Sequence, residues 1–279
     1  MKTNSERLYL DLMKKTLSYS LWPEPPMLFD LHKDIASKNI FRRFVNPAIN
    51  AIMEMTPYRL VLDRKYAEED RIKGKIWPSY GDTMIGLKRL DNLQFCVETV
   101  LQENVEGDLI ETGVWRGGSC IFMRAILKVY EDTQRKVYVA DSFEGLPKPD
   151  EKYPADKGDR HYAHPFLAVS QATVEYNFRK YDLLDDHVVF LKGWFKDTLP
   201  TAPIEKLSVL RLDGDMYSST IDVLNALYSK LSPRGFCIID DYHLDGCKQA
   251  VNDYRAQHGI SEKIIEIDDS GVYWRKGSQ

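Results

Sequence analysis

Hydrophobic residues change their spacing near residue 105, and this change predicts two kinds of structure along the chain. Before it, apolar positions recur at helical intervals, most regularly over residues 86–102, and prolines interrupt the earlier segments. After it, short apolar runs alternate with amphipathic stretches. We therefore expect residues 1–100 to form a helical N-terminal extension or lid within the same domain as a core over residues 101–279.

The alternation in the core predicts an α/β fold with a mostly parallel sheet and helices on both faces. We expect seven strands, the last two as a hairpin, at residues 107–113, 136–142, 187–193, 207–215, 235–241, 263–269 and 271–276. We expect the intervening helices at residues 118–130, 170–181, 194–200, 219–231 and 246–259. Sheets of this kind bind ligands outside the carboxyl ends of their strands.

Composition narrows the class of protein. The net charge of −4 provides no basic surface for nucleic acid, and no apolar stretch is long enough to cross a membrane. The polar N-terminus is unlike a signal peptide. Four cysteines occur without a CxxC pair, which argues against a zinc site and favours a reducing, cytoplasmic location.

Acidic residues stand where the predicted strands end. Glu111 and Asp141 close the first two strands, Asp213 and Asp215 follow the fourth, and the pair Asp240–Asp241 follows the fifth. Asp-Gly-Asp is also good turn chemistry, so independent turn aspartates are the alternative to a shared site. Because the carboxyl ends of parallel strands meet at one edge, we expect all of these acids to face one crevice.

The first strand leads into a glycine-rich turn, ETGVWRGGS, at residues 111–119. Its glycines permit close approach of the backbone to a ligand at the start of a helix. The spacing G-x-x-x-G-G is not the dinucleotide fingerprint G-x-G-x-x-G, and a tight strand–helix turn is the structural alternative. Asp141 lies where an acid typically accepts hydrogen bonds from ribose hydroxyls, which fits NAD or S-adenosylmethionine.

The aspartates of the fourth and fifth strands predict a metal site. Neighbouring strand ends lie about 5 Å apart, so Asp213, Asp240 and Asp241 are expected to converge. Clustered carboxylates repel one another and favour a bound cation, and a set of oxygen ligands suits Mg²⁺. His243 is expected to contact substrate or form the wall of the site rather than to bind the metal.

Four segments together resemble the macrocin O-methyltransferase (TylF-type) family over about residues 55–275: DLIETGVWRGGS, VYVADSFEGLP, LRLDGDMYSSTIDVLNALYSKLSPRGFCIIDDY and TMIGLKRLDNLQ. The resemblance implies a Rossmann-like class I methyltransferase fold. It also implies an S-adenosyl-L-methionine- and Mg²⁺-dependent enzyme that methylates a sugar hydroxyl of a glycosylated natural product in antibiotic biosynthesis.

The resemblance also assigns residues. It implies Asp213, Asp240 and Asp241 as metal ligands and Asp215 as the nearby base. The implied cofactor residues are Glu111, Thr112, Gly113 and Ser119 in the turn, Asp141 and Ser142 at the ribose, and Thr83 and Met84 over the methionine end.

Several alternatives stay open at this point. Asp213 could take the proton in place of Asp215, and a catechol or another vicinal diol could replace the sugar. A D-x-D glycosyltransferase, a nicotinamide dehydrogenase and a non-catalytic S-adenosylmethionine-binding protein each explain only part of the pattern. The loop at residues 145–170 is expected to line or cover the acceptor, or to serve as an oligomer arm. We expect a homo-oligomer, a dimer, with a small-molecule glycoside as its substrate.

Overall fold

The structure is a computed structural model that describes residues 3–28, 49, 51–53, 55–58, 61–63 and 65–278. The chain divides into two compact units, one formed by residues 1–21 and 68–279 and the other by residues 22–67. In the smaller unit, β1 (Met27–Leu28) pairs antiparallel with β2 (Val61–Leu62). The predicted helical extension or lid over residues 1–100 lies partly outside the described residues, and its role as a lid stays a prediction.

A seven-stranded sheet organises the larger unit, in the order β5-β4-β3-β6-β7-β9-β8. The five parallel strands are β3 (Asp108–Thr112), β4 (Val137–Asp141), β5 (Val188–Lys192), β6 (Leu207–Leu212) and β7 (Leu231–Ile239). The last strand, β9 (Val272–Arg275), pairs antiparallel with β7 on one side and with β8 (Ile265–Glu266) on the other. The strand order reverses between β3 and β6, and such switch points are where open α/β sheets bind ligands.

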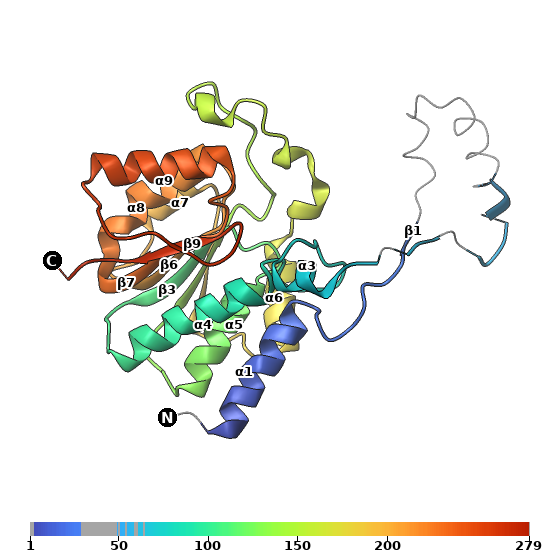
Figure 1. The fold of residues 1–279 in the computed structure, drawn as a ribbon, viewed down its shortest axis with the longest axis horizontal. Helices are drawn as coiled ribbons and strands as arrows, with labels where there is room; N and C mark the ends of the chain where they lie inside the picture. Colours follow the sequence, from blue (N-terminus) through green and yellow to red (C-terminus); the bar gives the residue numbers. More distant parts are fainter. Residues whose placement is uncertain are drawn as a thin grey trace. The chain divides into compact units, whose positions relative to one another are not determined.

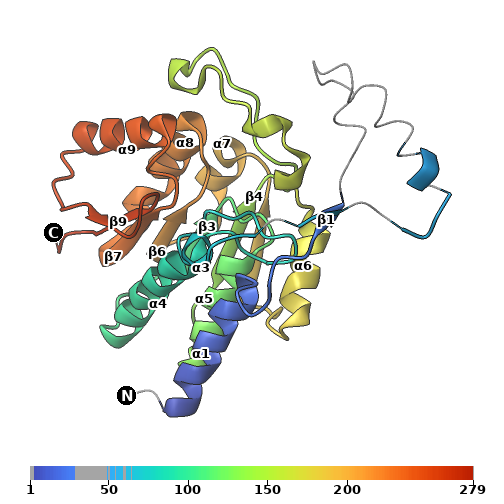
Figure 2. The same cartoon turned by 45° about the vertical axis from the view of Figure 1, so that its right-hand side comes forward.

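Helices cover both faces of this sheet (Figures 1 and 2). One face is covered by α4 (Gly86–Gln102), α5 (Gly118–Val129) and α6 (Gln171–Lys180), and α1 (Asn4–Leu17) packs on α4 and α5. The other packs against α7 (Phe195–Thr198), α8 (Tyr217–Leu227) and α9 (Asp245–Gln257). The short elements are α3 (Glu68–Ile72) and the 3-10 turns η2 (Pro154–Asp156), η3 (His161–Ala163), η4 (Pro165–Leu167), η5 (Leu199–Thr201) and η6 (Tyr228–Lys230).

The alternation of side chains along the strands builds two hydrophobic cores. Leu109 and Val209 enter the core under α4 and α5, whereas Ile110 and Leu210 enter the core under α8 and α9. The side-chain period of two therefore also fixes which polar residues share a face. Glu111 lies beside Arg211 in the β3–β6 register, on the same face as Leu109.

The predicted alternation of strands and helices is confirmed: each strand and helix expected after residue 105 is present, and the last two strands form the expected hairpin. β7 begins four residues earlier than predicted, because Leu231 already pairs with Leu207 ahead of a register shift. In the part of the chain that the structure describes, no helix is long and apolar enough to span a bilayer.

Candidate active site

A cavity of about 430 Å³ lies among the loops that follow β3, β4, β5 and β6. It is therefore placed at the carboxyl ends of the strands, where the sequence predicted a shared crevice. Of the residues singled out from the sequence, its lining includes Thr83, Met84, Glu111, Gly113, Ser119, Asp141, Ser142, Asp213 and Asp215. Asp240 and Asp241 lie next to this lining and are described below with Asp213.

Gly113 allows the ends of β3 and β6 to meet beside the cavity. Its φ is +86°, and a Cβ at this position would lie 1.7 Å from the carbonyl oxygen of Asp213. The Asp213 N–H donates to the Thr112 carbonyl at 2.9 Å, which closes the same junction. Only glycine fits here, because both the backbone conformation and the space exclude a side chain.

The segment that carries Thr83 and Met84 is fixed through its neighbour Asp82. The Asp82 carbonyl accepts the N–H of Gly118 at the start of α5 at 2.9 Å. Its carboxylate accepts hydrogen bonds from Lys180 Nζ at 2.8 Å and from the Tyr181 hydroxyl at 2.6 Å. These contacts hold the cavity wall at Thr83 and Met84 against the glycine-rich turn.

Asp141 ties two loops together at the end of β4. Its carboxylate oxygens accept the backbone N–H of Val114 at 2.8 Å and of Phe143 at 2.7 Å. Burial raises the pKa of Asp141, while these N–H groups oppose the rise. The Ser142 hydroxyl donates to the Gly145 carbonyl at 2.7 Å, so both predicted ribose residues shape the loop as well as facing the cavity.

The predicted cofactor residues of β3 differ in their access to the cavity. Glu111 and Ser119 line it, although both are almost completely buried. Burial raises the pKa of Glu111 to about 7, and the neighbouring Arg211 opposes this rise. Thr112 is fully buried in the strand, is absent from the lining, and directs its hydroxyl to the Arg211 carbonyl.

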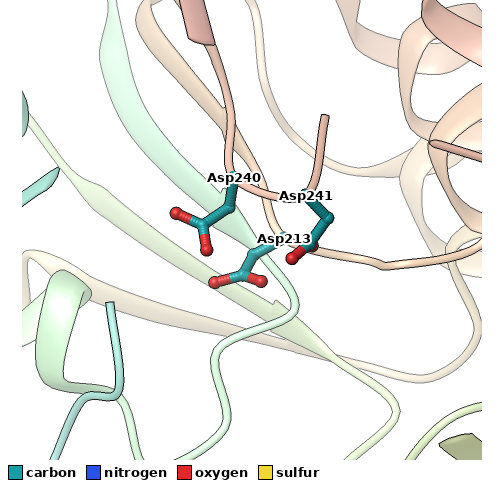
Figure 3. A group of neighbouring side chains, drawn as sticks. All are labelled: Asp213, Asp240 and Asp241. Carbon is teal, nitrogen blue, oxygen red and sulfur yellow. The ribbon is translucent and has the colours of Figure 1, made fainter. Parts of the chain in front are cut away.

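Asp213, Asp240 and Asp241 converge at the ends of β6 and β7, and one oxygen of each lies within 4.8 Å of the others (Figure 3). Burial raises the pKa of Asp241 well above its ordinary value, and the nearby Asp215, Asp213 and Asp240 add to the rise. Burial and Asp240 likewise raise the pKa of Asp213. The cluster is therefore short of positive charge on the side that faces the cavity.

Two buried arginines bind the other side of this cluster. Arg211 contacts Glu111, Asp213 and Asp240, and Arg89 from α4 contacts Asp240 and Asp268. Each oxygen of Asp240 accepts from one of these guanidinium groups. The carboxylates outnumber the two arginines, so the network retains excess negative charge.

The donor chemistry of the cluster fits a hard divalent cation. Only carboxylate oxygens converge there, and such ligands suit Mg²⁺. Asp213 and Asp241 have the freer oxygens, whereas Asp240 would share its oxygens between the cation and the arginines. A bound cation would offset the repulsion that raises the pKa values of Asp213 and Asp241.

Asp215 stands beside this cluster in an unusual backbone conformation. Its φ is +58°, in the left-handed region, and its N–H donates to Asp241 Oδ2 at 3.3 Å. Burial raises the pKa of Asp215 to about 7, Asp213 adds to the rise, and His161 opposes it. A carboxyl group with this pKa is well matched to proton transfer near neutral pH.

Some residues of the site were not singled out from the sequence. Trp115, Trp194 and Phe195 line the cavity from the turns after β3 and β5. These aromatic residues follow glycines at strand ends, and that position could have indicated them. Arg211 is a charged residue inside an apolar strand, and this could have indicated the buried network of charges. His243 is absent from the cavity lining, and its Nδ1 lies 2.6 Å from the Ser270 hydroxyl.

The doubly wound sheet, the glycine-rich turn and the acid after β4 define a Rossmann-like fold of the kind that binds nucleotide cofactors, and the aspartates after β6 and β7 add a cluster whose chemistry is compatible with a metal ion. The model of the macrocin O-methyltransferase (TylF) family matches residues 6–276. The chain belongs to this family and is a methyltransferase, as the resemblance in the sequence predicted. This excludes the glycosyltransferase and dehydrogenase alternatives.

Three known proteins illustrate the likeness. The chain is 54% identical over 223 residues to mycinamicin III 3''-O-methyltransferase of Micromonospora griseorubida, covering 78% of this chain and 88% of that protein. It is 48% identical to the 8-demethyl-8-(2,3-dimethoxy-α-L-rhamnosyl)-tetracenomycin-C 4'-O-methyltransferase of Streptomyces olivaceus, covering 99% and 95%. The solved O-methyltransferase NovP matches with a TM-score of 0.82 and 45% identity, covering 98% and 99%.

Proposed function

We propose that this protein uses S-adenosyl-L-methionine and Mg²⁺ to methylate a sugar hydroxyl of a glycosylated natural product during antibiotic biosynthesis. The observation that carries the proposal is the position of Asp215, which lies on the cavity wall beside a cluster of three aspartates. The relatives named above support the class of acceptor, because their names specify methylation of glycosylated compounds.

The cofactor would occupy the cavity between the β3 turn and Asp141. Asp141 would accept from the ribose, Thr83 and Met84 would enclose the methionine end, and Trp194 would face the adenine side of the cavity. S-adenosylmethionine supplies a methyl group on a positively charged sulfur. The acidic lining at Glu111 and Asp213 would favour that charge.

The aspartates would activate the acceptor. Asp213 and Asp241, with Asp240, would hold Mg²⁺, which when bound lowers the pKa of an acceptor hydroxyl and fixes its position. Asp215 would accept the proton of that hydroxyl. The hydroxyl oxygen would bond to the methyl carbon, in line with the sulfur, as the carbon–sulfur bond breaks and S-adenosylhomocysteine leaves. Asp213 is the alternative base, with Asp215 then contacting a neighbouring hydroxyl.

A comparison of acceptors tests the proposal. The purified protein would be incubated with S-adenosylmethionine and Mg²⁺ and offered mycinamicin III, a demethylated rhamnosyl tetracenomycin or a catechol. We expect a gain of one methyl group on a sugar, located by mass spectrometry and NMR. Methylation of the catechol alone would favour the vicinal-diol alternative, and no methylation of any glycoside would refute the proposed acceptor class.

Three further expectations stay predictions. A dimer would be detected by light scattering of the purified protein, and a monomer would contradict it. The cytoplasmic location rests on composition alone. Residues 145–170 would line or cover the acceptor, or serve as an oligomer arm.

A further inference from the structure

The loop at residues 145–170 forms one wall of the cavity. Its first part contributes Lys148, Asp150, Lys152 and Tyr153 to the lining, together with Leu167 near its far end. The loop therefore lies directly against the space assigned to the cofactor, and it continues into η2 at residues 154–156.

Asp156, at the end of η2, reaches from this loop to the start of α8. Its side chain is 2% exposed, and its two oxygens accept the backbone N–H of Tyr217 at 2.6 Å and of Ser218 at 3.0 Å. The first N–H groups of a helix have no hydrogen-bond partner within the helix, and a carboxylate at this end also interacts favourably with the helix dipole. The helix has no side-chain cap of its own at Met216, so the loop supplies it.

The capped end of α8 follows directly after the turn that carries Asp215. That turn is tight, with the Met216 N–H donating to the Gly214 carbonyl at 2.6 Å. A residue other than glycine in the left-handed region is disfavoured by about 1–2 kcal/mol, so Asp215 needs its surroundings to hold it there. Asp241 accepts a hydrogen bond from the N–H of Asp215, and Asp156 accepts hydrogen bonds from the N–H groups of Tyr217 and Ser218.

We propose that Asp156 is a positioning residue that couples the loop over the cofactor to the orientation of Asp215. The same loop closes the cofactor cavity and caps the helix that follows the base. Cofactor bound against the loop would stabilise it in the arrangement seen here, in which Asp156 holds the start of α8, and would so keep the carboxylate of Asp215 in place for proton transfer. The catalytic consequence rests on the proposed function of Asp215.

The packing around Asp156 leaves little freedom for another arrangement. A Cβ added to Gly246 of α9 would lie 3.3 Å from Asp156 Oδ1 and 3.2 Å from the Tyr217 nitrogen. The Tyr153 and Tyr217 rings also pack, with centroids 5.8 Å apart. The loop is therefore seated at the starts of both α8 and α9, and it forms part of the active site.

The test compares Asp156→Asn and Asp156→Ala with a matched control. Asparagine retains one acceptor and turns an amide N–H toward the second backbone donor, whereas alanine removes both acceptors. The control is Asp253→Asn, because exposed Asp253 accepts the hydroxyl of the same Tyr217 at 3.1 Å without touching the backbone of α8. Melting temperatures would identify a variant that fails to fold. If Asp156→Ala does not fold, Asp156→Asn still provides the test.

Hydrogen exchange followed by mass spectrometry would be measured with and without S-adenosylhomocysteine. In the wild type and the control, the ligand should slow exchange in residues 145–170. In Asp156→Asn that protection should fall several-fold, and kcat should fall by about 10–100-fold, as for a displaced catalytic group, with the acceptor KM little changed. Loop protection equal to the wild type, or unchanged kcat with the protection lost, would overturn the coupling.

The two proposals fail in distinguishable ways. The exchange measurement uses no acceptor and no metal, so it judges the contact between loop and helix even if no glycoside is methylated. Failure of the wild type to methylate any glycoside would refute the proposed acceptor. Wild-type turnover together with unaltered loop protection in Asp156→Asn would refute the coupling alone.

Discussion

Asp215 combines an unusual backbone conformation with an unusual side-chain pKa. Its left-handed backbone, its bond to Asp241 and its raised pKa all follow from its place between the end of β6 and the start of α8. A single substitution there separates proton transfer from binding. Asp141, by contrast, lines the part of the cavity proposed for the cofactor and organises the loops around it.

We expect Asp215→Asn to lower kcat by about 10²–10⁴-fold, because the amide keeps the shape of the side chain but cannot accept the proton. Calorimetry should show little change in cofactor and Mg²⁺ affinity. A loss of less than about tenfold at neutral pH would transfer the role of base to Asp213.

Asp141→Ala should weaken S-adenosylmethionine binding by about 1–3 kcal/mol, since it removes an acceptor for the ribose and releases the N–H groups of Val114 and Phe143. Titration calorimetry measures the change. Glu266→Ala, on the exposed strand β8, is a suitable control and should bind cofactor as the wild type does. Equal dissociation constants for Asp141→Ala and the control would contradict the cofactor assignment.

At the scale of elements, the junction of β3 with β6 decides whether the site can form. The two strand ends touch at Gly113, and the backbone bond from Asp213 to Thr112 lies next to it. The glycine therefore acts on the acidic cluster as well as on the cofactor turn. A change here should disturb two binding functions at once.

Gly113→Ala should destabilise the fold by at least about 4 kcal/mol, because the new Cβ would collide with the Asp213 carbonyl. Gly259→Ala is the matched control: its φ is also positive, at +62°, but a Cβ there meets nothing within 4 Å. It should lose only about 1–2 kcal/mol from the strained backbone. Equal losses in urea unfolding would show that conformation, rather than the collision, explains the glycine.

For the molecule as a whole, the acidic network would link stability to the proposed binding of Mg²⁺. Asp241 is buried beside three other carboxylates, and its pKa is raised well above its ordinary value. The metal-free protein therefore holds unfavourable repulsion at the centre of the site. Arg89 and Arg211 compensate only the part of the network that faces away from the cavity.

Mg²⁺ should raise the melting temperature of the wild type, because a ligand that binds only the folded state stabilises it. Asp241→Asn should melt at a higher temperature than the metal-free wild type near neutral pH, since it removes a repelled charge, and Mg²⁺ should stabilise this variant far less.

Chelation should abolish methyl transfer, and Mg²⁺ or Mn²⁺ should restore it. Full activity after exhaustive removal of metal would contradict the metal site.

Asp185 gives the molecule a separate dependence on pH. Burial disfavours its charge, but hydrogen bonds from Arg124 and Lys128 outweigh that effect and lower the pKa of Asp185. A lowered pKa means that its stabilisation is present above the ordinary aspartate pKa of about 4 and is lost as the pH falls below it.

Asp185→Asn should therefore destabilise the protein by about 1.5–3 kcal/mol at pH 7, leaving the buried Arg124 without its counter-ion. The difference from the wild type should shrink as the pH falls below about 4, measured by urea unfolding. Glu106→Gln, in the exposed pair with Lys206, should have little effect at any pH. A pH-independent difference for Asp185→Asn would argue against the ion pair as its cause.

Local patterns in the sequence were enough to predict the succession of strands and helices along the chain, the edge of the sheet that holds the site, and the acids that stand there. These follow from local rules: the spacing of apolar residues separates strands from helices, and each strand end is marked by its next residues. Glu111, Asp141, Asp213 and Asp240 could be placed at one edge because parallel strands end together. The family resemblance rested on these same local segments.

The groups that those acids contact depend on the folded chain and could not be predicted from the sequence. Arg89 reaches Asp240 across 151 residues of sequence, and Asp156 reaches Tyr217 across 61. A polar side chain carries no local signal of its distant partner, so the contacts of Arg89 in α4, Asp156 in the 145–170 loop and Asp268 in the final hairpin could not be predicted from the residues around them. The folded chain therefore decided which carboxylate oxygens are held by arginine, which face the cavity, and how Asp215 is oriented.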